Sequence, residues 1–280
     1  MAKNKNKIKD KHLLTTIFLL VYSALTAVPL VIAIINAFKP REEIMFRPLQ
    51  INFSTLTLDG IKNAFDLMNY PQAIMNNIIV LVISLTIMIV FGSLMGFAVA
   101  VVDTKVLKTM YLITILVITI PFQSIMIPIV ILLKKLNLLN SYFGTCMIFV
   151  ATSMSIVVFL YTGFMRSIPK ELSEAAIVDG CGIFKTYVTI YMPLLKTITG
   201  TVIIIRGQSI WNDLIVAMIT LTDARMFTMV YRLYTFVSNK FNRWDLVFSA
   251  ALLVSTPVII LFIFMQKAFV QGVVSGAVKG

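Results

Sequence analysis

Six long apolar runs, separated by polar segments, make up most of the chain. A helix needs roughly 20 apolar residues to span about 30 Å of hydrocarbon, and every run reaches that length. The pattern therefore predicts six transmembrane helices, at residues 13–38, 75–102, 109–133, 141–165, 194–221 and 246–269. Strands of about ten residues with alternating polarity, which would indicate an outer-membrane barrel, do not occur in the pattern.

The polar segments define the rest of the organisation. Residues 1–12 are a basic amino-terminal segment, 39–74 and 166–193 are long loops, and 270–280 are a tail. Basic residues before an apolar run also begin a signal peptide, but this run is too long for one and no small-residue cleavage pattern follows it. We therefore interpret the first run as a retained span.

Lysines and arginines indicate the orientation of the spans. Five of the first twelve residues are lysines, and the charge before the first span often decides which side is cytoplasmic. The inner segments carry only a small excess of basic residues overall, and the long outer loop counts for less. We expect both termini and the 166–193 loop in the cytoplasm, and the 39–74 loop outside.

Composition agrees with a protein that lies in a lipid bilayer. Hydrophobic residues make up 59% of the chain and charged residues 13%, and the mean hydropathy is +0.94. These values exceed what a soluble core of this length needs. The net charge of +12 would also suit a nucleic-acid-binding arm, but no interleaved aromatic pattern or separate soluble domain accompanies it. We expect no nucleic-acid partner.

The sequence predicts no catalytic residues and no metal site. Cys146 lies in the fourth span and Cys181 in an inner loop, so neither a disulfide framework nor a C-x-x-C site is expected. His12 is the only histidine, which argues against a metal centre. Gly-x-Ser-x-Gly, P-loop and His-Glu-x-x-His motifs do not occur. If such a chain moves a solute uphill, the energy comes from an ion gradient or another subunit.

The inner loop 166–193 has the pattern of two short helices. Pro169 suits a first helical turn and Gly180 suits the left-handed residue after a helix, which predicts a helix over about 169–179. The following apolar residues recur at helical spacing and predict a second amphipathic helix; they are Ile183, Phe184, Tyr187, Val188 and Tyr191. Pro193 ends it. A solvated hairpin that only connects two spans would have the same features.

The spacing within this loop is more specific than its helices. Glu174-Ala175-Ala176, then Gly180 after three residues, Ile190 after nine more, and Met192-Pro193 resemble the EAA loop of membrane permeases in ATP-binding-cassette (ABC) importers. That family has Glu-Ala-Ala, three residues, Gly, nine residues, Ile, one residue and Leu-Pro. Met192 replaces a leucine of similar volume, so the match is close.

Five other segments, in order along the chain, resemble the carbohydrate-uptake branch of these permeases, which includes the maltose transporter G subunit. They are AFKPREEIMFRP, STLTLDGIKNAF, IPIVILLKKLNLLNSYFG, WNDLIVAMI and QKAFVQGVVSGAVKG. Asn137, where glycine is usual, and Arg206-Gly207-Gln208 depart from the branch's pattern. The resemblance implies an all-α polytopic membrane protein, a type I importer transmembrane domain with its permease core at 75–269 and a cytoplasmic coupling helix.

The resemblance also implies that the inner loop docks on a cytoplasmic ATPase. The residues that would carry this contact are Glu174, Ala175, Ala176, Asp179, Gly180, Ile190 and Pro193. Small alanines allow close approach, and a glutamate can accept a charge-assisted hydrogen bond from a partner's lysine or arginine. The tail would add a second ATPase contact, or it is only a frayed end. Its residues are Gly276, Ala277, Val278, Lys279 and Gly280.

The implied partners are a second homologous permease, an ATPase dimer that binds ATP and Mg²⁺, and an extracytoplasmic sugar-binding protein at a bacterial cytoplasmic membrane. No cofactor is expected in this chain. The expected cargo is a sugar, specifically an oligosaccharide, and another solute such as glycerol phosphate is the alternative. An ion-coupled secondary transporter would more often have an inverted repeat and broken helices with intramembrane acids, which the sequence does not indicate. A membrane-embedded enzyme would need a polar cluster near one interface.

Polar residues in the fifth span are candidates for a substrate pathway. They are Arg206, Gln208, Trp211, Asn212 and Asp213. A central arginine opposes membrane insertion by about 2.5 to 3.5 kcal/mol, and Asp213 follows two helical turns later on the same face. Arg206 could contact substrate, pair with Asp213 or extend to the headgroups. Trp211 could stack on a sugar ring or lie at the outer interface.

Two prolines interrupt the third predicted span. Pro121 and Pro128 each remove a backbone donor, so we expect kinks there. A kink could serve as a gate or could only reflect packing, since prolines are common in membrane helices.

Overall fold

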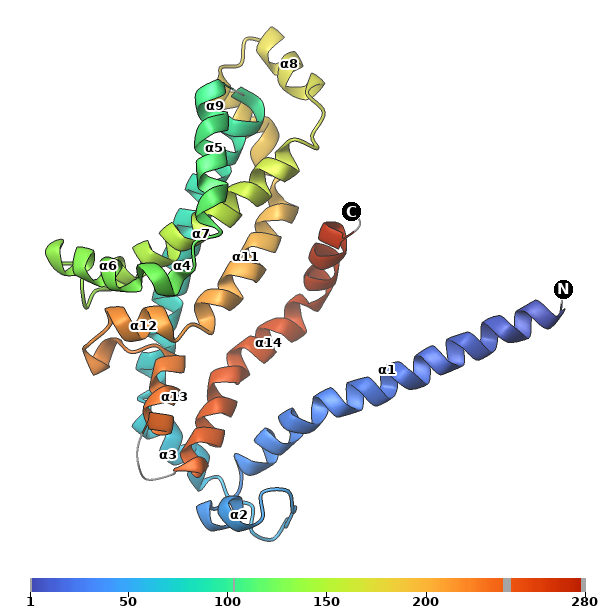
Figure 1. Cartoon of the computed structure of the whole chain (residues 1–280), viewed down its shortest axis with the longest axis vertical. Helices are drawn as coiled ribbons and strands as arrows, with labels where there is room; N and C mark the ends of the chain where they lie inside the picture. Colours follow the sequence, from blue (N-terminus) through green and yellow to red (C-terminus); the bar gives the residue numbers. More distant parts are fainter. Residues whose placement is uncertain (1, 103, 239–242, 278–280) are drawn as a thin grey trace. The chain divides into compact units, whose positions relative to one another are not determined.

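A computed structural model of the chain describes the backbone of residues 2–102, 104–238 and 243–277, and the side chains of residues 15–102, 104–238 and 243–263 (Figure 1). The regular elements in these ranges are all helical. Two compact units divide the chain: Met1–Asn69 with Thr235–Pro257, and Tyr70–Tyr234 with Val258–Gly280. Among the described residues, four helices are long and apolar enough to cross a membrane, or six if each of two bent helix pairs is one span.

The first unit contains three helices and the start of a fourth: α1 (Ala2–Asn36), α2 (Arg41–Phe46), α3 (Asp59–Leu67) and α14 (Trp244–Ala277). α2 and α3 lie within the predicted 39–74 loop. The candidate span Thr15–Asn36 in α1 has no buried residues in its apolar window, so no described residue of this unit covers that window.

Buried hydrogen bonds hold the turn that follows α1. Lys39 is buried, and its Nζ donates to the carbonyl oxygens of Arg47 and Pro48 at 3.2 and 3.0 Å. The Ser249 hydroxyl, also buried, donates to the Ala37 carbonyl at 2.9 Å. Buried polar groups are stable only with such partners, so these bonds fix the turn after α1 and join it to the start of α14.

The second unit contains most of the remaining helices: α4 (Tyr70–Phe97), η1 (Ala98–Val102), α5 (Lys105–Val117), α6 (Phe122–Lys135), α7 (Tyr142–Met165), α8 (Glu171–Val178), α9 (Ile183–Thr186), η2 (Tyr187–Tyr191), α10 (Met192–Leu194), α11 (Lys196–Trp211), α12 (Ile215–Thr220), η3 (Ala224–Met226) and the start of α13 (Met229–Ser238). η1 and η2 are π-helical. α4 and α7 pack together, and α11 packs against both (Figure 1).

Two glycines let α4 approach α7 closely. A Cβ atom at Gly92 would lie 2.5 Å from Val157 Cγ1, and one at Gly96 would lie 2.7 Å from Tyr161 Cβ and 3.1 Å from the Thr162 amide nitrogen. The spacing Gly-x-x-x-Gly places both glycines on one helix face, the arrangement that brings membrane helices into contact. The α4–α7 pair is therefore the closely packed centre of this unit.

The third predicted span, 109–133, is not one continuous helix. α5 ends at Val117, α6 begins at Phe122, and the two helices meet at 105°. Pro121 lies at the break with extended backbone, at φ −63° and ψ 131°, and it has no N–H to continue the helix. The expected kink at Pro121 is therefore a full break, whereas α6 continues through Pro128.

The fifth predicted span, 194–221, is also interrupted. α11 ends at Trp211 and α12 begins at Ile215, and the segment Ile183–Leu194 before α11 is bent from it by 70°. Asp213 Oδ1 accepts the amide protons of Val216 and Ala217 at 2.8 and 3.4 Å, so this carboxylate caps α12. The expectation of an unbroken helix is therefore wrong for this span, and Asp213, already a candidate from the sequence, lies at the break.

Asn137 occupies a left-handed backbone position. Its φ is +55°, in the turn after α6, and Asn140 has a φ of +57°. Asparagine tolerates this conformation better than other residues with a Cβ atom, and glycine adopts it without strain. The departure from glycine at position 137 therefore preserves the turn.

Candidate functional site

The inner loop forms a short helix closed by a glycine turn. α8 runs from Glu171 to Val178, and Gly180 follows with a φ of +75°, which confirms the predicted left-handed position. The Cys181 amide donates to the Ala176 carbonyl at 2.9 Å, and the Gly180 amide donates to the Ile177 carbonyl at 3.0 Å. These two bonds make a Schellman motif, the hydrogen-bonding pattern that ends many helices at glycine.

The motif residues on α8 face different surroundings. Glu174, Ala175 and Asp179 are exposed, so they are available to another protein. Ala176 is only 5% exposed and turns toward the chain itself. The expectation that both alanines face a partner is therefore wrong for Ala176. Farther along, Ile190 is half-buried and Pro193 is exposed.

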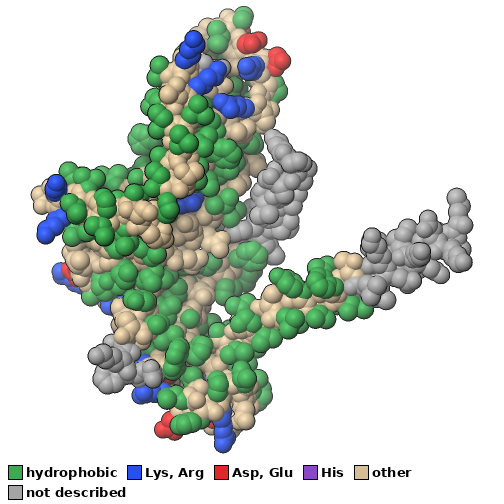
Figure 2. All heavy atoms as spheres, in the orientation of Figure 1, with side chains coloured by type: hydrophobic (Ala, Val, Ile, Leu, Met, Phe, Trp, Pro, Cys, Tyr) green, Lys and Arg blue, Asp and Glu red, His purple; other side chains and the backbone are tan. Residues whose placement is uncertain are grey.

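Large apolar side chains that the motif does not include dominate the free surface of the loop. Val178 is 86% exposed and Phe184 71% exposed. Other exposed apolar residues here are Leu172, Ile177 and Ile183. Charged side chains gather at the same end of the unit (Figure 2), and the exposed ones include Arg166, Lys170, Glu171, Glu174 and Lys185. An apolar patch with a charged border is typical of a protein–protein contact.

The apolar residues of the predicted second amphipathic helix are not all buried on one face. Tyr187 and Tyr191 are buried, whereas Ile183 and Phe184 are exposed. The difference lies in their neighbours, because Tyr187 and Tyr191 pack against Phe97 of α4, whereas Ile183 and Phe184 precede this contact. The exposed pair belongs to the free surface, and the two tyrosines anchor the loop to the rest of the unit.

The predicted second ATPase contact lies almost entirely outside the described side chains. Gly276 and Ala277 end α14, and only their backbone is described. Val278, Lys279 and Gly280 lie outside the described residues.

Arg206 and Asp213 do not pair in the described structure. Arg206 Nη2 donates to the Ser153 hydroxyl of α7 at 2.6 Å, and its Nε is buried without a hydrogen-bond partner among the described residues. Asp213 instead caps α12. The arginine therefore joins α11 to α7, and the hypothesis of an Arg206–Asp213 ion pair is wrong because the helix ends before it reaches Asp213.

The other candidate pathway residues divide into buried and exposed groups. Trp211 is buried, so it is neither open to a sugar ring nor at an exposed interface in this conformation. Gln208 and Asn212 are exposed, as is Ser209. Amides and hydroxyls on the free surface of an apolar helix face a polar pathway or another helix more favourably than they face lipid.

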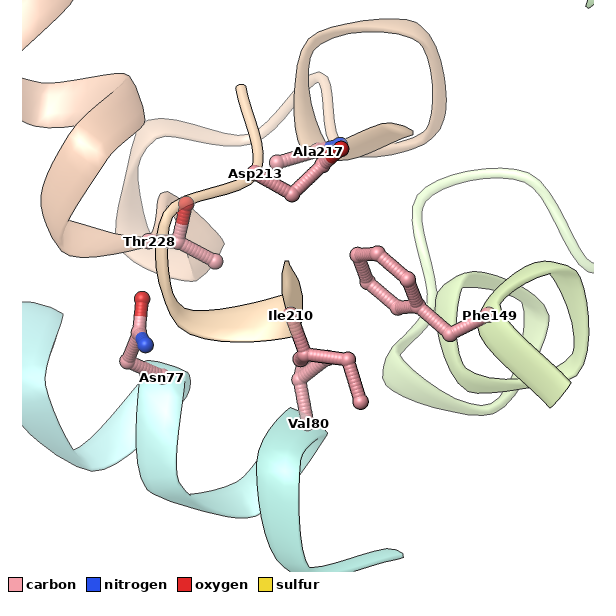
Figure 3. A pocket seen from close by; sticks show the side chains of 7 residues that line it. All are labelled: Asn77, Val80, Phe149, Ile210, Asp213, Ala217 and Thr228. Atoms are coloured by element: carbon pink, nitrogen blue, oxygen red, sulfur yellow. The ribbon is translucent and has the colours of Figure 1, made fainter. Parts of the chain in front are cut away.

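A narrow gap lies beside the break after α11, between α4, α7 and α12 (Figure 3). No part of it is wide enough for a water molecule, so it is not a substrate cavity in this conformation. Asn77 Nδ2 and Thr228 Oγ1 border it without hydrogen-bond partners in the described structure. No group of three His, Cys, Asp or Glu side chains within the described ranges is placed to hold a metal ion.

The segment after α12 is fastened to α4 by residues that sequence reasoning missed. Asn76 Nδ2 donates to the carbonyls of Arg225 and Phe227 at 2.8 and 3.0 Å, and Asn76 Oδ1 accepts the Tyr142 hydroxyl at 2.7 Å. Asn77 Oδ1 accepts the Met229 amide at 3.2 Å. Two adjacent asparagines in an apolar run were the available signal, because buried amides require partners.

An ion pair lies in the same segment. The Arg225 guanidinium contacts Asp223 at 2.7 Å, and its hydrogen bonds hold the pKa of that carboxyl below its usual range. Asn140 Oδ1 accepts the amide protons of Thr222 and Asp223 at 3.0 and 2.9 Å. This loop is therefore ordered by side chains of α4 and of the turn before α7.

Comparisons with known proteins agree with this architecture. Residues 88–275, more than half of the chain, match the family described as "Binding-protein-dependent transport system inner membrane component". The chain is 36% identical over 226 residues to the melibiose/raffinose/stachyose import permease protein MelC of Bacillus subtilis (strain 168), which covers 80% of this chain and 82% of that protein. It is 32% identical over 273 residues to the probable starch degradation products transport system permease protein AmyC of Thermoanaerobacterium thermosulfurigenes, covering 98% and 99%.

A solved structure shows the same fold. A chain from the crystal structure of a bacterial ABC transporter involved in the import of the acidic polysaccharide alginate superposes with a TM-score of 0.73 at 19% identity. The match covers 91% of this chain and 95% of the other.

Proposed function

Because this chain belongs to the family of binding-protein-dependent transport system inner membrane components, we propose that it is a permease subunit of an ABC importer for a sugar, specifically an oligosaccharide. The observation that carries the proposal is the exposed inner loop, with Glu174 and a large apolar patch beside a glycine-closed helix. The curated relatives support the cargo class, since their names specify melibiose, raffinose, stachyose and starch degradation products. Members of the family are transport components and not enzymes.

The orientation follows from the basic amino-terminal segment. Both termini and the α8–α10 end of the second unit face the cytoplasm of a bacterium, and the loops 39–74 and 222–243 face outward. The asparagine-fastened segment after α12 then lies on the side from which a binding protein delivers its sugar.

The partner ATPase contacts the α8 surface. Glu174 accepts a charge-assisted hydrogen bond from a lysine or arginine of the ATPase, and Val178 and Phe184 enter an apolar groove. ATP and Mg²⁺ are bound by this ATPase dimer, while this chain binds no cofactor. Movement of the ATPase then reaches the spans through the inner loop.

A second homologous permease completes the pathway. The exposed Gln208 and Ser209 of α11, and Asn212 directly after it, support this, because one chain leaves them without cover. In a pathway between two permeases, these polar side chains can form hydrogen bonds with the hydroxyl groups of a sugar. Arg206 lies on the same helix, but it joins α11 to α7 through Ser153 and its Nε is buried, so we assign it to the structure and not to the pathway.

The coupling proposal is tested with two acidic residues of the same helix. A Glu174→Ala chain is expressed with its ATPase, second permease and binding protein, and Glu171→Ala serves as the matched control because Glu171 is also exposed. Loss of a hydrogen bond to a charged group lowers affinity by about 10- to 100-fold. We therefore expect loss of ATPase co-purification and sugar uptake for Glu174→Ala only. Normal uptake in both variants would refute the docking proposal.

The cargo is tested separately. The binding protein that co-purifies with the complex is screened with neutral di-, tri- and tetrasaccharides, glycerol phosphate, amino acids and peptides by thermal shift, because a bound ligand stabilises the folded protein. We expect oligosaccharides to raise its melting temperature. A shift with glycerol phosphate, amino acids or peptides and none with saccharides would contradict the sugar assignment.

A further inference from the structure

A buried hydrogen bond joins the base of the inner loop to α4. The Tyr187 hydroxyl lies 2.7 Å from Ser93 Oγ, and both residues are buried. Ser93 Oγ also lies 3.1 Å from the Val90 carbonyl, the acceptor that takes its proton. Tyr187 is therefore the donor in this pair, and Ser93 is its acceptor.

Aromatic contacts strengthen the same joint. The Phe97 ring lies 5.2 Å from the Tyr187 ring at 55° and 5.0 Å from the Tyr191 ring at 68°, measured between ring centroids. Tilted and edge-on pairs at this separation are favourable. All three rings are buried, at 4%, 7% and 2% exposure, so the contact has no free space in which the rings can slide.

Both backbones change their helical form at this contact. η2 begins at Tyr187 and ends at Tyr191, while η1 begins directly after Phe97. π-helical turns are rare and are frequent at functional sites. The two π-helical segments in the described ranges, η1 and η2, therefore both adjoin the cluster of Phe97, Tyr187 and Tyr191.

α4, the helix that carries Ser93 and Phe97, is not free to move alone. Gly92 and Gly96 bring α4 against Val157 and the backbone of α7, and Ser93 and Phe97 lie next to these glycines. A force on Ser93 and Phe97 therefore moves α4 together with α7, because the close contact leaves no gap to absorb the displacement.

We propose that Tyr187 is the positioning residue that transmits movement of the α8–α10 loop to the α4–α7 pair, through its hydrogen bond to Ser93 and its contact with Phe97. This inference rests on the proposed function, since it requires a loop that an ATPase moves. The loop has an exposed docking surface on α8 and a buried attachment at Tyr187. A displacement applied at the α8 surface therefore reaches the spans through the attachment at Tyr187.

The test measures how much sugar is transported for each ATP hydrolysed. The complete importer is reconstituted in liposomes with this chain, its second permease, the ATPase and the binding protein. Tyr187→Phe removes only the hydroxyl, and Ser93→Ala removes its acceptor. The matched control is Tyr161→Phe, because the Tyr161 hydroxyl makes a similar bond, 2.9 Å from Thr199 Oγ1 between α7 and α11.

We expect Tyr187→Phe and Ser93→Ala each to lower the transport-to-hydrolysis ratio about fivefold, the effect of one lost buried hydrogen bond. The double variant should show no further loss, because both changes remove the same bond. Assembly and basal ATP hydrolysis should remain, and Tyr161→Phe should keep the normal ratio. An unchanged ratio in Tyr187→Phe, an equal loss in Tyr161→Phe, or additive losses in the double variant would each overturn the inference.

Failure of this inference is distinguishable from failure of the proposed function. If Glu174→Ala abolishes uptake while Tyr187→Phe transports normally, the loop couples but Tyr187 does not transmit. If Glu174→Ala transports normally, the docking proposal itself fails, and with it this role of Tyr187.

Discussion

Replacing Gly96 by alanine should separate the α4–α7 pair and destabilise the protein. The added Cβ would lie 2.7 Å from Tyr161 Cβ and 3.1 Å from the Thr162 amide nitrogen. Ordinary carbon contacts are about 3.5 to 4.0 Å, so one helix must shift by roughly 1 Å. The obstacle includes the backbone of α7, which cannot rotate away as a flexible side chain would.

The magnitude follows from two opposing effects. Overpacking a close contact destabilises by about 1 to 3 kcal/mol, and alanine in a helix gains about 0.5 to 1 kcal/mol over glycine. With the middle value of each range, the net loss is about 1 kcal/mol. At roughly 2 to 4 °C for each kcal/mol, we expect Gly96→Ala to lower the melting temperature by several degrees.

Thermal unfolding of the purified complex in detergent measures this effect. Gly163→Ala is the matched control, because Gly163 lies in α7 and a Cβ there would meet nothing within 4 Å. It should melt at or slightly above the parent temperature. If Gly96→Ala melts as the parent or as Gly163→Ala does, the close α4–α7 contact is not what holds this unit together.

Three further changes have expected outcomes. Gly180→Ala places a Cβ at a φ of +75°, which opposes the turn by about 1 to 2 kcal/mol and should reduce ATPase co-purification. Asn76→Ala removes hydrogen bonds to two carbonyls of the 222–229 segment, and limited proteolysis there should become faster. Arg225 lowers the pKa of Asp223, so their contact stabilises the loop at neutral pH and is lost as pH falls through that lowered pKa. Proteolysis of the same segment should therefore accelerate in acid.

Each of these has its own control. Gly182→Ala lies in the same turn at a φ of −68° with nothing near its Cβ, and it should keep normal co-purification. Asn52→Ala, in an exposed turn of the first unit, should leave cleavage of residues 222–229 unchanged. Asp223→Asn should abolish the acid dependence, and persistence of that dependence in the variant would refute the assignment to this carboxyl.

The apolar pattern predicted the helices whose runs are uninterrupted. α4 with η1 covers the second predicted span and α14 contains the sixth. α7 covers the fourth except its first residue, and α1 covers the first except its last two. The length of the continuous helix was overestimated in the third and fifth runs. Hydropathy averages over a window and does not register one residue that ends a helix. Proline chemistry at Pro121 allowed the first break to be anticipated as a kink. The second break required knowing that Asp213 bonds forward to α12.

The loop motif was readable, but the direction of its side chains was not. Helical spacing correctly predicted α8 and the left-handed Gly180, because local turn chemistry determines both. It placed Phe184 and Tyr187 on one face, and their rings do lie 6.3 Å apart, but Tyr187 is buried whereas Phe184 is 71% exposed. The burial of Tyr187 depends on Ser93 and Phe97, which lie about ninety residues away and are invisible to any local pattern.

α4 connects the two ends of the second unit that contain the functional contacts. Asn76 holds the segment after α12 at one end of this helix, and Ser93 and Phe97 hold the inner loop near the other. Twenty-one residues of helix separate Asn76 from Phe97, a length of about 30 Å, which matches the hydrocarbon thickness of a bilayer. Because α4 is unbroken over this length whereas the third and fifth runs are interrupted, it can transmit a displacement rigidly. Under the proposed function, movement of the inner loop would therefore reach the opposite end of this unit along α4 and the α7 helix packed against it.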